Sequence, residues 1–188
     1  MYRMPTATLP TPPPDPLSHA RRPDDAATLA FAGVLAQALR RGRRPLIRGL
    51  SEARFQKLLN EYFCDLALSN GAAASAKPAE AEEFDEIVEL LLEHRGIPSE
   101  PGAWLAYTVA TAAMGENHLW QDMGLPSRKV LSELMRNHFP TLAAKNSGDM
   151  KWKKFFYRQL CERADVPICK SPHCADCCDY AICFGPEA

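Results

Sequence analysis

Apolar side chains recur along most of this chain at intervals of three and four residues, the spacing of one face of an α-helix. The clearest stripe lies in residues 51–68 and comprises Phe55, Leu58, Leu59, Tyr62, Phe63 and Leu66. A second stripe, on a strongly acidic segment, comprises Phe84, Ile87, Val88, Leu91 and Leu92. No stretch alternates with period two and β-branched residues are scarce, so the pattern predicts an all-α fold.

Local signals indicate where the helices begin and end. Asp24 or Asp25, Ser99 and Ser127 are placed to cap helices at their first turns, and Gly42 is placed to end one. With the apolar stripes, these signals place long helices at residues 24–41, 51–68, about 101–117 and about 149–164, with others before Gly96 and after Ser127.

The first 23 residues lack the helical pattern. They hold seven of the sixteen prolines and few large apolar side chains, so they cannot bury enough surface to offset chain entropy. The whole chain of 188 residues, 46% of them hydrophobic, is long enough for one core. We therefore expect a disordered arm over residues 1–23, a single helical domain over 24–164, and a cysteine-rich metal-binding loop over 165–188 that packs as part of that domain.

Charge is segregated, although the net charge is only −1. Residues 1–50 carry eight arginines against three aspartates, whereas residues 51–101 carry four basic and eleven acidic side chains. The basic patches are short and the chain is slightly acidic, so we expect no nucleic-acid partner. Glycine-rich phosphate loops are missing from the sequence, which argues against nucleotide chemistry.

Neither a membrane nor a secretory location is indicated. The longest weakly apolar run, residues 103–114, is too short to span a bilayer, and the N-terminus lacks the apolar core of a signal peptide. We therefore expect a cytoplasmic protein with no membrane partner, in a compartment where thiols stay reduced.

Five of the seven cysteines lie in the last 20 residues. Four of them, Cys169, Cys174, Cys177 and Cys183, have the spacing C-x4-C-x2-C-x5-C. The first three reproduce the C-x4-C-x2-C run of plant-type [2Fe–2S] ferredoxins. Structural zinc sites more often use two ligand pairs separated by a dozen or more residues. The spacing therefore favours an iron–sulfur cluster over zinc.

Several assignments stay open at this point. Cys178 adjoins Cys177, and using it instead would give C-x4-C-x3-C-x4-C, which is also sterically possible. The odd cysteine count and the lack of a secretion signal argue against a disulfide framework. His173 lies within the array and is a possible further ligand. For His118, at the end of a predicted helix, a core or capping role is favoured.

Two cysteines and one basic helix lie outside the array. Cys64 and Cys161 occur on helical patterns and are interpreted as small buried side chains, with Cys161 closer to the array. We hypothesise that the basic side chains of the helix before the array offset the charge of a cluster or attract an oxyanion such as molybdate. An ordinary solvated or docking face is the alternative. These side chains are Lys151, Lys153, Lys154, Arg158 and Arg163.

Three segments carry a resemblance to a known family. They are residues 118–127 (HLWQDMGLPS), 149–162 (DMKWKKFFYRQLCE) and 169–184 (CKSPHCADCCDYAICF). Together they resemble the NifQ family of nitrogen fixation, and the likeness covers roughly residues 50–184. That family is understood to carry a molybdenum–iron–sulfur cluster and to supply molybdenum for assembly of the nitrogenase iron–molybdenum cofactor.

The resemblance implies a carrier rather than an enzyme, and no nucleophile–base pair is apparent in the sequence. It implies that the cofactor-assembly scaffold NifEN and the nitrogenase iron protein NifH are the partners, with molybdate as the metal source. It selects Cys177 over Cys178, so that the implied ligands are Cys169, Cys174, Cys177 and Cys183. The alternatives are a zinc-stabilised interaction module with four cysteine ligands, a plain electron-transfer iron–sulfur protein, and a molybdate-binding protein without a cluster.

Overall fold

The structure, a computed structural model, describes residues 13–72, 78–165 and 177–187. Within these ranges all regular elements are helical, and the one β-type pairing is an isolated bridge between Ala20 and Phe63. This confirms the all-α prediction. The elements are η1 (Pro16–His19), α1 (Ala26–Arg40), α2 (Glu52–Tyr62), α3 (Pro78–Glu93), α4 (Glu100–Ala113), α5 (Leu119–Asp122), α6 (Arg128–His138), α7 (Pro140–Lys145), α8 (Trp152–Arg163) and α9 (Tyr180–Phe184).

The predicted helix caps are confirmed. The Asp25 carboxylate accepts a hydrogen bond from the N–H of Thr28 at 2.9 Å, at the start of α1. The hydroxyls of Ser99 and Ser127 each accept from the N–H three residues further on, at 3.2 and 3.4 Å. These bonds satisfy N–H groups that have no partner inside the first turn of a helix. After α1 the chain reverses at Gly42, whose φ of +61° suits glycine.

The second helix is shorter than its apolar stripe. It ends at Tyr62, because Phe63 adopts an extended conformation (φ −129°, ψ 155°) and pairs with Ala20. Leu66 is still buried, although it lies beyond the helix. The stripe therefore predicted which side chains enter the core, whereas the predicted end at residue 68 is wrong.

The predicted arm also begins to fold earlier than expected. Residues 16–19 form η1, whose first residue, Pro16, is buried. The N–H of Arg21 donates to the carbonyl of Tyr62 at 2.9 Å, which joins this stretch to the end of α2. The prediction of disorder is therefore wrong for residues 13–23. Residues 1–12 lie outside the described residues.

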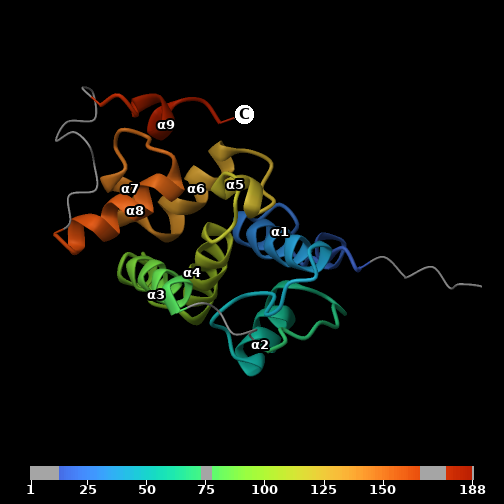
Figure 1. Ribbon diagram of the computed structural model, residues 1–188. Coiled ribbons are helices and arrows are strands. Elements are labelled where there is room, and N and C mark those ends of the chain that lie inside the picture. The colour runs from blue at the N-terminus through green and yellow to red at the C-terminus, as the bar shows by residue number, and fades with distance from the viewer. Residues whose placement is uncertain (1–12, 73–77, 166–176, 188) are drawn as a thin grey trace, which may run out of the picture.

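The core is built around α4, which contacts α1, α3 and α5. In Figure 1, α4 runs through the middle of the molecule, with α1 on one side and α3 on the other. Its Trp104 is 2% exposed. Edge-to-face contacts join Tyr62 to this indole at 6.5 Å and to Phe31 at 4.6 Å between ring centroids. Such pairs add about 0.5–1.5 kcal/mol each to the burial of their surface.

The last described helix, α9, is bonded to the start of α8 through Cys183 and Lys151 and lies at the end of the molecule opposite α2 (Figure 1). The segment predicted as a metal-binding loop is thus partly helical. None of the helices in the described ranges has both the length and the apolar character needed to cross a lipid bilayer.

Candidate metal centre

Two of the four predicted ligands are described, one before the short helix α9 and one within it. Cys177 precedes the helix, and its carbonyl accepts a hydrogen bond from the N–H of Tyr180 at 3.0 Å. Cys183 lies in the last turn and packs against the hydrophobic core. Both side chains are half-buried, and neither forms a disulfide with another described residue. Thiols in this state can take up a soft metal once they lose their protons.

The other predicted ligands, Cys169 and Cys174, lie outside the described residues, as does His173. Within the described ranges, no three or more His, Cys, Asp or Glu side chains gather in a way that could hold a metal ion. The four-thiolate site therefore stays a prediction from the sequence.

The cysteines outside the predicted ligand set occupy three different environments. Cys178 is exposed, with its Sγ 3.8 Å from Oδ1 of Asp179. Cys161 is half-buried on α8. Cys64 is exposed, so its predicted burial is wrong. The reason is that α2 ends before it, and in the extended chain that follows its N–H donates to the carbonyl of His19 at 2.7 Å.

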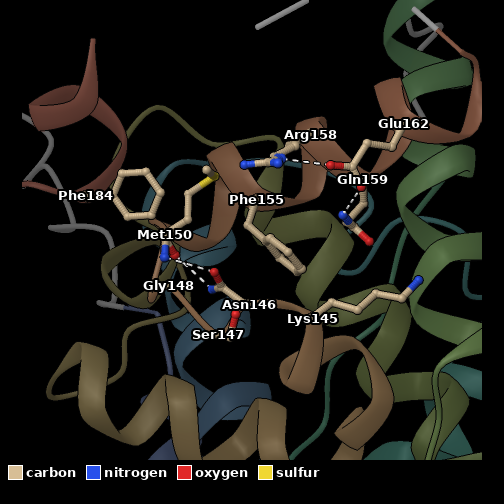
Figure 2. A pocket seen from close by; sticks show the side chains of 10 residues that line it. All are labelled: Lys145, Asn146, Ser147, Gly148, Met150, Phe155, Arg158, Gln159, Glu162 and Phe184. Carbon is tan, nitrogen blue, oxygen red and sulfur yellow. Dashed lines mark hydrogen bonds and ion pairs between the residues drawn. The ribbon is translucent and has the colours of Figure 1, made fainter. Parts of the chain in front are cut away.

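A main-chain hydrogen bond ties α9 to the start of α8. The N–H of Lys151 donates to the carbonyl of Cys183 at 2.8 Å. The next residue, Phe184, stacks on Tyr180 with ring centroids 4.6 Å apart and faces the turn before α8 at Gly148 (Figure 2). The backbone of one predicted ligand is thereby held on the helical domain.

A second attachment comes from Arg128, at the start of α6. Its Nη1 lies 3.1 Å from Oε1 of Glu187, a carboxylate that is only 6% exposed. Its Nη2 donates to the carbonyls of Asp149 and Met150, at 2.6 and 3.1 Å. The Nδ1 atom of His118 lies 3.6 Å from the same Oε1. Arg128, which belongs to α6, thus contacts both Glu187 and the turn before α8. No sequence motif singled out this arginine.

His118, for which we expect a core or capping role at the end of a helix, lies instead at the N-cap of the next helix, α5. Its N–H donates to the side-chain oxygen of Gln121 at 3.1 Å. The imidazole lies near the carboxylate of Glu187, and His118 belongs to no group of three or more possible metal ligands among the described residues.

A buried ion pair joins two of the segments that carry the family resemblance. The side chain of Asp122 is 2% exposed and lies 2.7 Å from Nζ of Lys153 and 3.6 Å from Arg41. Burial alone would raise the pKa of this carboxyl, but hydrogen bonds from Lys153 and from Asn117 lower it below its ordinary 3.8. Lys153 also donates to the carbonyl of Gly115 at 2.8 Å. The pair fixes α8 against α5.

This ion pair bears on the expectation for the basic helix. Lys153 points into the domain toward Asp122, so its charge is already paired with a buried carboxylate. Arg163 pairs with Glu93 of α3. Arg158 instead lines a cavity of about 570 Å³ beside Phe184, as Figure 2 shows.

Comparisons with known proteins bear on the whole chain. The family model named NifQ matches residues 30–185. Protein NifQ of Rhodobacter capsulatus is 38% identical over 179 residues, which cover 93% of this chain and 98% of that protein. Protein NifQ of Azotobacter vinelandii is 37% identical over 155 residues, which cover 76% of this chain and 80% of that protein. No solved structure matches the chain. The chain therefore belongs to the NifQ family of nitrogen-fixation proteins.

Proposed function

We propose that this protein carries a molybdenum–iron–sulfur cluster in the cytoplasm and supplies molybdenum for biosynthesis of the nitrogenase iron–molybdenum cofactor. The observation that carries the proposal is the family match over residues 30–185, which spans the whole array from Cys169 to Cys183. The recipients in this proposal are NifEN and NifH. The protein acts as a donor and not as an enzyme that turns over a substrate.

The chemistry of the array supports this role. Thiolates are soft ligands that suit iron–sulfur clusters and not magnesium or calcium. A donor has to protect its cargo and also release it. Cys177 and Cys183 are both half-buried, and Cys183 packs against the core, which supports partial protection of a bound cluster. A cluster bound at the surface of the domain is accessible to a partner protein.

The three segments of the family resemblance also meet in space. Asp122 of the first segment pairs with Lys153 of the second, and Lys151 of the second binds the backbone of Cys183 in the third. The likeness of these segments therefore supports one structural unit, in which α5 is paired with α8 and the start of α8 is bonded to α9.

The test is anaerobic purification followed by quantification of iron, sulfide and molybdenum, together with an assay of molybdenum transfer to NifEN. We expect all three elements in the wild type and a loss of loading in Cys177→Ala. Cys178→Ala should load normally. The matched control is Cys64→Ala, which removes an exposed cysteine far from the array in sequence.

Other metal contents of the purified protein would contradict the proposal, each in a different way. One zinc ion with no iron would indicate a structural zinc site. Iron and sulfide without molybdenum, with reversible reduction, would indicate electron transfer. Molybdate binding that survives replacement of all four array cysteines, with no iron or sulfide present, would indicate a molybdate-binding protein without a cluster.

A further inference from the structure

A buried carboxylate lies four residues after Cys183 of the candidate metal centre. The side chain of Glu187 is 6% exposed. Its Oε1 lies 3.1 Å from Nη1 of Arg128 at the start of α6 and 3.6 Å from Nδ1 of His118 at the N-cap of α5. A carboxylate loses its hydration on burial, and this cost is left uncompensated when its charged partner is removed. Burial of Glu187 therefore depends on Arg128.

The guanidinium of Arg128 is held in place independently of Glu187. Its Nη2 donates to the carbonyl oxygens of Asp149 and Met150, at 2.6 and 3.1 Å, and lies 2.9 Å from the Asp149 carboxylate. Because the guanidinium is planar, these bonds to one nitrogen also fix the direction of Nη1. Arg128 is thus a preformed binding site for the carboxylate of Glu187.

The helix that carries Cys183 depends on its attachments to the domain. Helix α9 has five residues, whereas isolated helices shorter than about 12–15 residues are marginal in water. One attachment is the hydrogen bond from the N–H of Lys151 to the carbonyl of Cys183. Another is the packing of Cys183 and Phe184 against the hydrophobic core. The ion pair of Glu187 is a third, and it is the one that involves charge.

The segment between α9 and the buried carboxylate is short. It consists of Gly185, which is extended (φ −62°, ψ 167°), and Pro186, whose ring fixes φ. Figure 1 shows the chain leaving α9 toward α5, where His118 meets Glu187. With two residues between them, the carboxylate and the last turn of α9 cannot move far apart. The ion pair therefore restrains Cys183.

We propose that Arg128 and Glu187 form a clasp that positions Cys183 and sets the rate at which its thiol exchanges partners. While the clasp is closed, Cys183 stays half-buried against the core; when it opens, α9 detaches and the thiol becomes accessible. The inference rests on the proposed function for one step, the release of cargo, because a donor has to hand over what its thiolates hold. The family match ends at residue 185, so this contact is a feature of the present chain.

The test is alkylation of the metal-free, full-length protein with iodoacetamide under reducing conditions, followed at each cysteine by mass spectrometry. Glu187→Gln should speed alkylation of Cys183 about tenfold, because a charge-assisted hydrogen bond is lost. Cys161, half-buried on α8, is the internal reference. A general loss of stability would speed both cysteines, whereas opening of the clasp should change the rate at Cys161 by less than about twofold.

A double-mutant cycle tests whether the two side chains act together. Arg128→Met should speed alkylation of Cys183 as much as Glu187→Gln does, and the double variant should be no faster than either, because each change already opens the clasp. The matched control is Glu100→Gln, the same change at a glutamate that is 41% exposed and lies 3.4 Å from Lys57. Exposed pairs contribute little, so the control should react like the wild type.

The cargo step is tested on the anaerobically loaded protein. Glu187→Gln should start with the iron content of the wild type and should lose iron to bathophenanthroline disulfonate about tenfold faster. Glu100→Gln should lose iron at the wild-type rate. An equal rate of iron loss in Glu187→Gln and the wild type would overturn the role of the clasp in release.

Three alkylation results would overturn the clasp itself: an unchanged rate at Cys183 in Glu187→Gln, an equal acceleration at Cys161, or a further acceleration in the double variant. If one of these occurs while the loaded protein still donates molybdenum, the proposed function stands without the clasp. If alkylation follows the expectation in a protein that never loads iron, the clasp stands as a guard of the thiol and the proposed function is removed.

Discussion

The buried pair of Asp122 and Lys153 gives the sharpest test of the fold around the candidate centre. Lys153→Met keeps the length of the side chain and removes its charge, which leaves the carboxylate with side-chain exposure of 2%. Removing one partner of a buried pair costs about 3–5 kcal/mol. Arg41 remains 3.6 Å away and Asn117 still donates two hydrogen bonds to the carboxylate. We therefore expect the free energy of unfolding to fall by about 3 kcal/mol, the lower end of that range. For a chain of this size that corresponds to about 6–12 °C in Tm.

The same variant should reverse the pH dependence contributed by Asp122. In the wild type the folded pKa is lowered, so the stabilisation is present above the unfolded value and is lost as the pH falls through the folded pKa. In Lys153→Met the effect of burial is no longer opposed by the ammonium, and the folded pKa should lie above the unfolded value. As the pH falls, the folded variant then takes up a proton at Asp122 before the unfolded chain does. The difference in free energy of unfolding between the wild type and the variant should therefore shrink between pH 7 and pH 4.5.

The assay is urea unfolding of both proteins at several pH values, read as the difference in free energy of unfolding at each pH. Other titrating groups act equally on the two proteins, so they cancel in this difference. Lys154→Met, at an exposed position of the same helix, is the control and should unfold like the wild type. A deficit that stays constant or grows on acidification would refute the assignment of a buried, charge-paired Asp122.

Three further predictions concern other parts of the domain. Arg128→Met leaves the Glu187 carboxylate without its guanidinium, which should lower the free energy of unfolding by about 1–3 kcal/mol. The same variant should speed alkylation of the Cys183 thiol in the metal-free protein. Gly115→Ala places a Cβ 2.4 Å from an oxygen of the buried carboxylate in α5, which should lower stability by about 1–3 kcal/mol in thermal unfolding. Burial lowers the pKa of His138, so stability should fall as the pH drops below about 6.5, and His138→Gln should flatten this slope in urea unfolding.

Each of these three predictions has a result that would contradict it. An unchanged alkylation rate in Arg128→Met would mean that this side chain does not hold α9. Wild-type stability of Gly115→Ala would mean that the approach of Asp122 is looser than the structure has it. An unchanged slope in His138→Gln would assign the loss of stability at acidic pH to other groups, among them His94, whose pKa burial also lowers.

The helices were predictable because their signals are local. Asp25, Ser99 and Ser127 each bond to an N–H three residues away, within reach of the side chain in any context. The apolar stripe of residues 55–66 entered the core as predicted because burial follows hydrophobic periodicity. The end of that helix was not predictable, since Phe63 leaves it to pair with Ala20, 43 positions earlier in the chain.

By itself, the sequence determined the helical class and the caps, and it predicted a four-cysteine metal site, because all of these depend on residues close together in the chain. Only the tertiary structure decided what the charged side chains do. Lys153 turns inward because Asp122, 31 positions away, is buried opposite it, and Arg128 reaches Glu187 across 59 positions. The reason is physical: a buried charge requires a partner, and packing of distant segments alone decides which partner is within reach.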